Sequence, residues 1–110
     1  MKKKNIIRKT EEFSKIINEN HRQNNKYFTV YYQLKTKEEN RFGISIPKKI
    51  TNAVNRNKIK RRIKTIIDNN FQNKNKNDYV IIAKKDILNT IYQEIEINLV
   101  KIINKIEGED

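Results

Sequence analysis

The stretch RFGISIPKKITNAVNRNKIKRRIK, residues 41–64, contains a strand, a break and the start of a helix. Pro47, the only proline in the chain, is expected to end the strand because it has no backbone N–H to donate to a sheet. From residue 51 to about residue 70 the apolar spacing changes from that of a strand to that of a helix. The apolar residues are Phe42, Ile44 and Ile46 in the strand and Ile59, Ile63, Ile66 and Ile67 in the helix.

Before this stretch, the sequence predicts a short helix that starts near Thr10. Thr10 is a suitable N-cap, and Glu11 and Glu12 in the first turn interact favourably with the helix dipole. The helix is expected to lie between a mobile basic tail, residues 1–9, and a polar loop, residues 21–26.

The run KYFTVYYQLK, residues 26–35, is typical of a strand because it is rich in aromatic and β-branched residues. We expect it to form a hairpin with the strand at 41–47, through a turn-rich connection at 36–40. One face of this strand would carry Phe28, Val30, Tyr32 and Leu34, and the more amphipathic face Tyr27, Thr29, Tyr31 and Gln33.

After the basic helix, a polar connection at 72–78 leads to the apolar run YVIIA, residues 79–83. A continuous apolar run is typical of a strand that is buried on both faces. Residues 89–107 predict the clearest helix of the chain, in which Thr90 and Gln93 can form a capping box. Its apolar stripe consists of Ile91, Ile95, Leu99, Ile102 and Ile106.

The predicted order is therefore helix, strand, strand, helix, strand, helix. The helix between the second and third strands is long enough to connect two parallel strands. The fold class is α+β: a two-layer α/β sandwich with a small mixed sheet, one domain over residues 1–110, whose acidic end at 107–110 is expected to fray. Part of one sheet face would stay open for binding.

The charge of the chain points to a polyanionic partner. Its 110 residues include 25 lysines and arginines against 13 aspartates and glutamates, a net charge of +12. Self-repulsion at this charge opposes compaction unless a polyanion offsets it. The abundance of Ile, Asn and Lys is typical of an AT-rich genome, so only the pattern of the lysines carries weight. No cysteine is present, which is consistent with a cytoplasmic location, and no apolar run reaches the length of a membrane span.

The cations of residues 48–64 gather at the end of the helix where they are least favourable. Lys48 and Lys49 precede the helix, and the dipole already makes its N-terminus partly positive, so each cation costs a few tenths of a kcal/mol. This placement suits an anion that is held by helix-end amides and flanking cations. A merely solvated basic face is the competing interpretation. On the helix, the side away from the isoleucines carries Asn57, Lys60, Arg61 and Lys64.

Residues 41–64, followed by DYVIIAKK at 78–85, resemble the protein subunit of bacterial ribonuclease P. The family motif has the form K-K-x-x-x-A-V-x-R-N-x-x-K-R-x-x-[RK], and its spacing is intact here. The resemblance extends over about residues 6–106 and is most specific in the motif. The matching residues are Lys48, Lys49, Ala53, Val54, Arg56, Asn57, Lys60, Arg61 and Lys64.

The resemblance implies that a large RNA subunit, with Mg²⁺ that it mainly holds itself, cleaves precursor tRNA and frees its 5′ leader. It also implies a left-handed crossover between the parallel strands, although the general rule predicts a right-handed one. It implies RNA-subunit contacts by Lys48, Lys49, Arg56, Asn57, Lys60, Arg61 and Lys64, and a leader cleft between the first helix and the sheet, with Phe13, Ile17 and Tyr31.

The sequence departs from the family at a few positions. Ile17 stands where the family often has a second Phe, so apolar contact replaces stacking there. Lys64 replaces the commoner Arg and offers a point charge instead of a planar fork. Pro47 occupies a position that is often small or polar in the family. Without the resemblance, ordinary strand packing would remain the simpler interpretation of the tyrosines at residues 27 and 31.

No residues in the chain suggest a protein active site. His21 is the only histidine, and Glu38 and Glu39 fall in an apparent turn, whereas a protein nuclease needs a histidine pair or clustered carboxylates. The aromatic signature of an RNA-recognition motif is also absent. The alternative function is a small ribosomal-type or RNA-chaperone protein with no role in cleavage. A module that binds anionic membranes is third, because no helix combines a basic face with a bulky aromatic face. No protein partner is implied.

Overall fold

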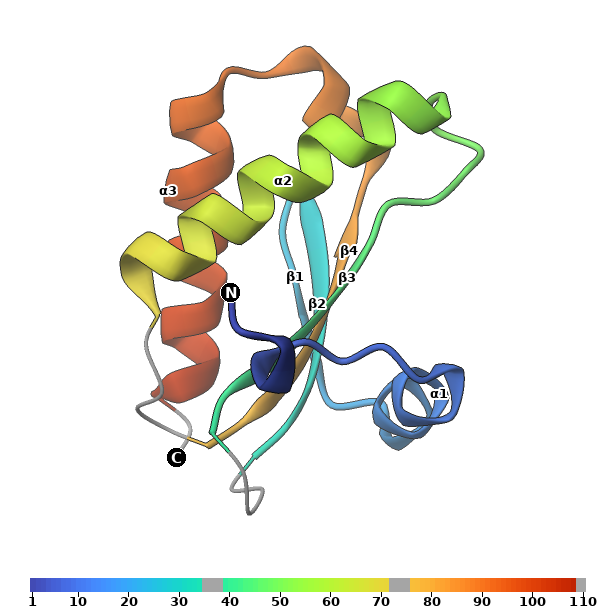
Figure 1. The fold of residues 1–110 in the computed structure, drawn as a ribbon. Helices are drawn as coiled ribbons and strands as arrows, with labels where there is room; N and C mark the ends of the chain where they lie inside the picture. The colour runs from blue at the N-terminus through green and yellow to red at the C-terminus, as the bar shows by residue number, and fades with distance from the viewer. Residues whose placement is uncertain (35–38, 72–75, 109–110) are drawn as a thin grey trace.

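The structure is a computed structural model that describes residues 1–34, 39–71 and 76–108. The described residues form three α-helices, two short 3₁₀ helices and a four-stranded sheet (Figure 1). In chain order the elements are η1 Lys3–Asn5, α1 Thr10–Glu19, β1 Arg22–Asn24, β2 Phe28–Gln33, β3 Arg41–Ser45, α2 Ala53–Asn70, β4 Asp78–Ala83, η2 Lys85–Asn89 and α3 Tyr92–Glu107. The predicted connections at 36–40 and 72–78 lie partly outside the described residues.

The sheet is mixed and has the strand order β1-β2-β4-β3. β2 runs antiparallel to both β1 and β4, whereas β3 and β4 are parallel. The predicted α+β class and parallel crossover are therefore confirmed, and the hand of the crossover stays a prediction. The predicted hairpin between β2 and β3 is wrong, because β4 lies between them. β4 is apolar on both faces, and a central position buries both of those faces.

The strand β1 was missed, because its sequence RQN carries no strand signal. It is held by backbone pairing to β2, in the register Arg22↔Tyr31 and Asn24↔Thr29. The backbone hydrogen bonds between strands depend only weakly on the side chains. A polar segment can therefore pair with a neighbouring strand whose edge is free. The expectation of a polar loop at 21–26 is thus wrong for these three residues.

An Asn25 turn explains a second difference from the prediction, at Tyr27. The side-chain oxygen of Asn25 accepts hydrogen bonds from the backbone N–H groups of Tyr27 and Phe28, at 3.0 and 2.8 Å. Such a turn ends just before β2, so the alternation of faces starts only at Phe28. Tyr27 is therefore buried in the main core and does not share the more open face with Thr29 and Tyr31.

The main core lies between the sheet and the pair α2 and α3, which cover the same face (Figure 1). All four predicted isoleucines of α2 are buried, which confirms its stripe. In α3 the stripe is confirmed except at Ile91, which is 63% exposed because it is the N-cap. The capping box of Thr90 and Gln93 is wrong, since α3 begins only at Tyr92 and its N-cap makes no side-chain hydrogen bond.

α1 packs on the opposite face of the sheet, where a smaller apolar cluster forms around Ile7, Ile16 and Val80. The helix ends near the predicted residue, but its N-cap is Lys9 and Thr10 is its first helical residue. α1 covers only part of this face, as predicted.

The N-terminal segment before α1 is not a mobile tail. Asn5 and Ile7 are buried, and Ile6 forms a parallel β-bridge with Phe42. The N–H of Ile7 donates to the carbonyl oxygen of Phe42 at 3.0 Å. The segment thus lies along the outer edge of β3. No helix within the described ranges is long and apolar enough to cross a membrane.

Candidate nucleic-acid interface

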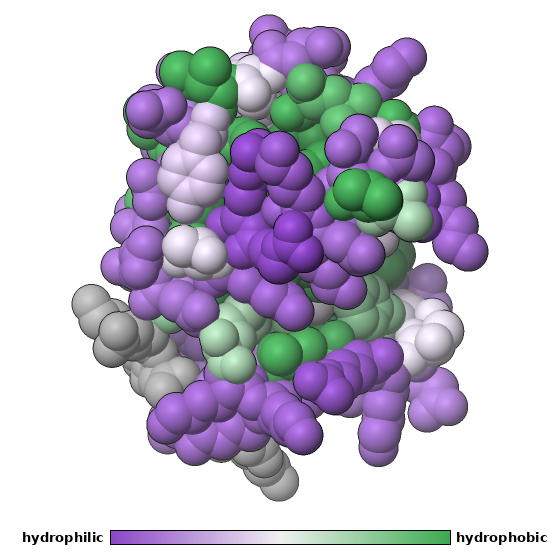
Figure 2. All heavy atoms as spheres, turned by 45° about the horizontal axis from the view of Figure 1, so that its top comes forward, coloured by the Kyte–Doolittle hydropathy of each residue, from purple (hydrophilic) through white to green (hydrophobic). Residues whose placement is uncertain are grey.

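The predicted basic face lies on α2 and on the turn that precedes it. The side chain of Asn52 caps the helix by accepting a hydrogen bond from the N–H of Asn55 at 2.9 Å. Because the isoleucines fill the buried side of α2, its cations are turned toward solvent. Figure 2, in which the top of Figure 1 comes forward, shows a mostly hydrophilic surface with small apolar patches. Lys48, Lys49, Asn57, Lys60 and Arg61 are exposed, and Arg56 and Lys64 are half-buried.

Arg56 is the cation of the motif whose orientation is fixed by the protein. Its Nη1 donates to the carbonyl oxygen of Thr51 at 2.9 Å, beside the first turn of α2. This bond uses only one of the several N–H donors of a guanidinium. The planar group is therefore held at the helix start, where its remaining edge can meet an anion.

The three predicted cleft residues lie together on the open face of the sheet. Phe13, Ile17 and Tyr31 are each half-buried, and all pack against the cluster that contains Ile16 and Val80. The ring of Phe13 lies directly on Gly43 of β3, because a Cβ built there would be 2.5 Å from the Phe13 Cζ atom. Glycine thus gives the ring room to reach the sheet.

Two further residues border this cleft and were not predicted. Ile82 of β4 is half-buried and packs against the same cluster. Arg22 of β1 donates from Nη1 to the hydroxyl oxygen of Tyr31 at 3.4 Å. The alternation of β4 could have identified Ile82, but Arg22 carries no signal because its strand is not recognisable from sequence.

A hollow of about 390 Å³ connects the basic face with the aromatic cleft. Its lining includes Lys60 and Lys64, one turn apart on α2, together with Arg8 of the N-terminal segment and Phe13 of α1. Phe42 and Ile44 of β3 also line it. The structure therefore brings residues of both predicted sets, the cations of α2 and an aromatic residue of the cleft, to one hollow.

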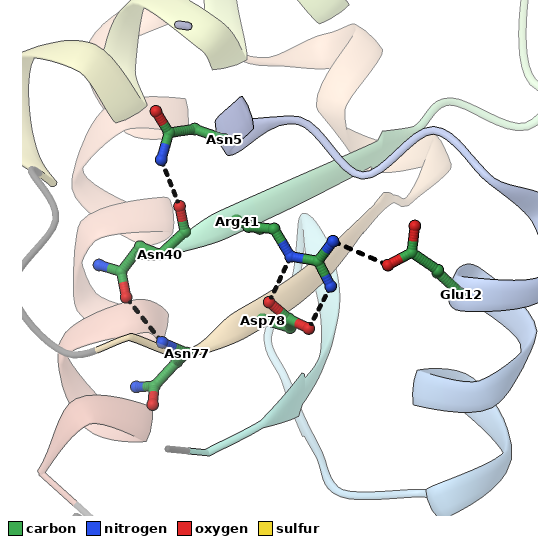
Figure 3. Close-up of polar contacts among 6 residues, drawn as sticks. All are labelled: Asn5, Glu12, Asn40, Arg41, Asn77 and Asp78. Carbon is green, nitrogen blue, oxygen red and sulfur yellow. Dashed lines mark hydrogen bonds and ion pairs between the residues drawn. The ribbon is translucent and has the colours of Figure 1, made fainter. Parts of the chain in front are cut away.

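Arg41, at the start of β3, joins three elements beside this cleft (Figure 3). Its Nε and Nη2 donate to the two carboxylate oxygens of Asp78 at 3.0 and 2.7 Å, and its Nη1 is paired with Glu12 Oε2 at 2.7 Å. Hydrogen bonding to Asp78 raises the pKa of Arg41 above its ordinary value, so the guanidinium stays charged. Sequence could have suggested the pair with Asp78, because Arg41 begins one predicted strand and Asp78 immediately precedes the other, and the two strands were expected to be parallel.

Buried asparagines connect the same ends of β3 and β4 (Figure 3). The side-chain oxygen of Asn40 accepts from the N–H of Asn77 at 2.8 Å, and Asn5 Nδ2 donates to the Asn40 carbonyl oxygen at 2.9 Å. The N-terminal segment is thereby fixed to the strand that carries Arg41.

The described part of the chain offers no evident metal centre. Within it, no group of three or more His, Asp or Glu side chains is arranged to hold a metal ion. His21 is exposed, and its ring centroid lies 6.0 Å from that of Tyr32. The described residues therefore offer no carboxylate cluster for a protein-bound Mg²⁺ ion.

Taken together, these features define a class: a small, strongly basic α+β protein with a cationic helix beside a partly open sheet face. The sequence model of the family described as Ribonuclease P matches residues 1–107. The chain belongs to this family, as a protein component of ribonuclease P, which is an endoribonuclease of tRNA maturation. Membership implies partnership with a ribonuclease P RNA.

Relatives and solved structures agree over nearly the full length. The ribonuclease P protein component of Mycoplasma mycoides is 37% identical, with 97% of this chain and 100% of the relative covered. That of Bacillus mycoides is 38% identical, with 96% and 93% covered. The structure of the Staphylococcus aureus RNase P protein has a TM-score of 0.83 at 30% identity, with 91% of this chain and 93% of that chain covered.

Proposed function

We propose that this chain binds the RNA subunit of ribonuclease P through the cations of α2 and the preceding turn, and holds the 5′ leader of precursor tRNA between α1 and the sheet. Binding of both partners assists the Mg²⁺-dependent cleavage that the RNA carries out. The observation that carries the proposal is the hollow that Lys60 and Lys64 of α2 line together with Phe13 of α1.

The RNA-subunit contacts are assigned to Lys48, Lys49, Arg56, Asn57, Lys60, Arg61 and Lys64. Cations that neutralise phosphates release counterions and supply most of the affinity for a polyanion. Arginine and asparagine add directional donors, which position the protein on the RNA. The fixed guanidinium of Arg56 supports this role, because little side-chain freedom is lost when it binds.

The leader contacts are assigned to Phe13, Ile17 and Tyr31. Proteins hold single-stranded RNA by stacking bases on aromatic side chains beside a positive groove. Phe13 and Tyr31 are half-buried, so each is packed in place and keeps an exposed surface. Ile17 contributes apolar contact alone.

In this proposal the RNA subunit holds most of the Mg²⁺. The described carboxylates of the chain do not cluster around a metal position, and those of Glu12 and Asp78 are paired with Arg41. No step of the cleavage is therefore assigned to a residue of this chain, which acts by binding and positioning in the cytoplasm.

Reconstitution tests the proposal directly. The purified chain is added to a matched bacterial ribonuclease P RNA at low Mg²⁺, with a precursor tRNA that bears a 5′ leader. We expect 5′ cleavage to be restored, and none with the protein alone. Full cleavage by the protein without the RNA, or no effect of the protein on the RNA's activity, would overturn the proposal.

A further inference from the structure

α1 is attached to the sheet by a small apolar cluster. It has ten residues, and Ile16 is its only fully buried residue. Helices of this length are not stable alone, and they depend on tertiary contacts. Phe13 and Ile17 are half-buried, so the apolar contact between α1 and the sheet is small.

Two adjacent contacts fix α1 against β3. Glu12 is paired with Arg41 at 2.7 Å, and the ring of the next residue, Phe13, rests on Gly43. Arg41 and Gly43 are two residues apart, so both contacts join the same turn of α1 to the same face of β3. The ion pair and the Phe13 ring therefore hold the same turn of α1 against β3.

We propose that Arg41 is a positioning residue that sets the separation of α1 from the sheet, and thereby the width of the leader cleft. This inference rests on the proposed function, since it concerns the cleft assigned to the leader. Glu12 acts with Arg41 by holding α1 in place.

The chemistry of the site requires arginine. Asp78 is buried, at 3% exposed, and a buried carboxylate is stable only when its charge is paired and hydrogen-bonded. A planar guanidinium can bind Asp78 with two donors and still present a third to Glu12, which a lysine ammonium cannot do in one plane. Because Asp78 fixes the guanidinium, Glu12 is tied to a rigid partner.

The direction in which Glu12→Gln changes binding of the leader distinguishes a positioning role of Glu12 from a purely electrostatic one. A carboxylate beside a cleft that binds RNA repels phosphate, so removing it would tighten RNA binding if charge alone mattered. If Glu12 holds the cleft, its removal has the opposite effect on the leader. Glu12→Gln leaves the Arg41–Asp78 pair intact, so the variant is expected to fold.

The test uses the reconstituted holoenzyme and two substrates, a precursor tRNA with a single-stranded leader and the same tRNA without one. Glu11→Gln is the matched control, because exposed Glu11 lies in the same first turn and its loss changes the net charge equally. We expect Glu12→Gln to lower the preference for the leader-bearing substrate roughly two- to fivefold, the range of partly exposed ion pairs. Affinity for the RNA subunit and for the leaderless tRNA should stay unchanged.

The outcomes are distinct. If Glu12→Gln and Glu11→Gln show the same preference for the leader-bearing substrate, the positioning role is overturned while the proposed function stands. If the unaltered chain itself shows no preference for the leader, the proposed function fails, and this inference fails with it.

A double-variant cycle gives a second, independent readout. Arg41→Lys keeps the charge but loses the fork, so we expect it to lower the preference for the leader at least as much as Glu12→Gln. Adding Glu12→Gln to Arg41→Lys should cause no further loss, because both act through one contact. Fully additive losses would overturn the proposal. Thermal unfolding of each variant verifies that the protein remains folded.

Discussion

The two faces of the sheet differ in how far their apolar residues are buried. Under α2 and α3 the face is closed, and its residues form one large buried cluster. On the α1 side the fully buried hydrophobic residues of the described chain form a small cluster, Ile7, Ile16 and Val80, and their aromatic and aliphatic neighbours stay half-exposed. The closed face supplies the stability of the fold. That stability allows the other face to keep aromatic surface available for a ligand.

The largest expected effect comes from the closed face. Ile63 is fully buried on α2, so Ile63→Ala removes apolar contact and leaves a cavity. We expect the free energy of unfolding to fall by about 2–5 kcal/mol, measured by urea denaturation. Ile97→Ala is the control, because Ile97 is 46% exposed on α3 and should change stability little. Equal losses in the two variants would contradict the assignment of the core to this face.

The second prediction concerns the packing between Phe13 and Gly43. In Gly43→Ala the new methyl group would lie 2.5 Å from the Phe13 ring, so the ring must move. We expect a loss of about 1–3 kcal/mol of stability, typical of overpacking, together with a weaker preference for leader-bearing substrate. The combination Gly43→Ala with Phe13→Ala should recover part of the stability but not the preference. An unchanged preference in Gly43→Ala would separate Phe13 from leader binding.

The third prediction concerns the basic face. Arg61→Ala should weaken binding to the RNA subunit about tenfold at low salt and reduce the slope of log K against log salt by about one unit. The matched control is Lys101→Ala on α3, where an exposed cation lies outside the proposed interface. Salt titrations of both variants measure the effect. Lost stability with an unchanged slope would mean that Arg61 has a structural role.

The smallest expected effect is a gain. Ile17 packs beside Phe13 and Tyr31 but cannot stack on a base. Ile17→Phe adds an aromatic platform at a half-buried position, so we expect leader-bearing substrate to bind a few times more tightly. Ile17→Leu, which keeps an aliphatic side chain, is the control. Competition binding to the holoenzyme measures the difference, and equal affinities would show that Ile17 does not face the leader.

The sequence predicted those elements whose burial requires a regular pattern of apolar residues. The isoleucine stripe of α2 and the apolar run of β4 are strong patterns because burial selects them. The grouping of Phe13, Ile17 and Tyr31 came from the family resemblance, and the geometry is consistent with it.

The features that were missed depend on backbone pairing or on tertiary contacts. β1 is polar throughout and joins the sheet by backbone pairing to β2, so its three residues contain no apolar periodic signal. The apolar run of β4 indicates a strand buried on both faces, but which strands flank it depends on pairing across the sheet, which no local pattern encodes. The pairing of Glu12 with Arg41 could not be predicted without knowing where α1 packs on the sheet. Each residue taken alone has an ordinary surface charge.

The N-terminal segment covers one edge of the sheet, which affects how the free protein behaves before it binds RNA. The edge strands of a sheet expose unpaired backbone groups on which other chains can add a strand and aggregate. One edge here is β1, which is only three residues long, and the other is β3, beside which Ile6 and Ile7 lie. Both edges are thus poor templates for a second copy. This arrangement, together with a net charge of +12, opposes self-association of the free protein.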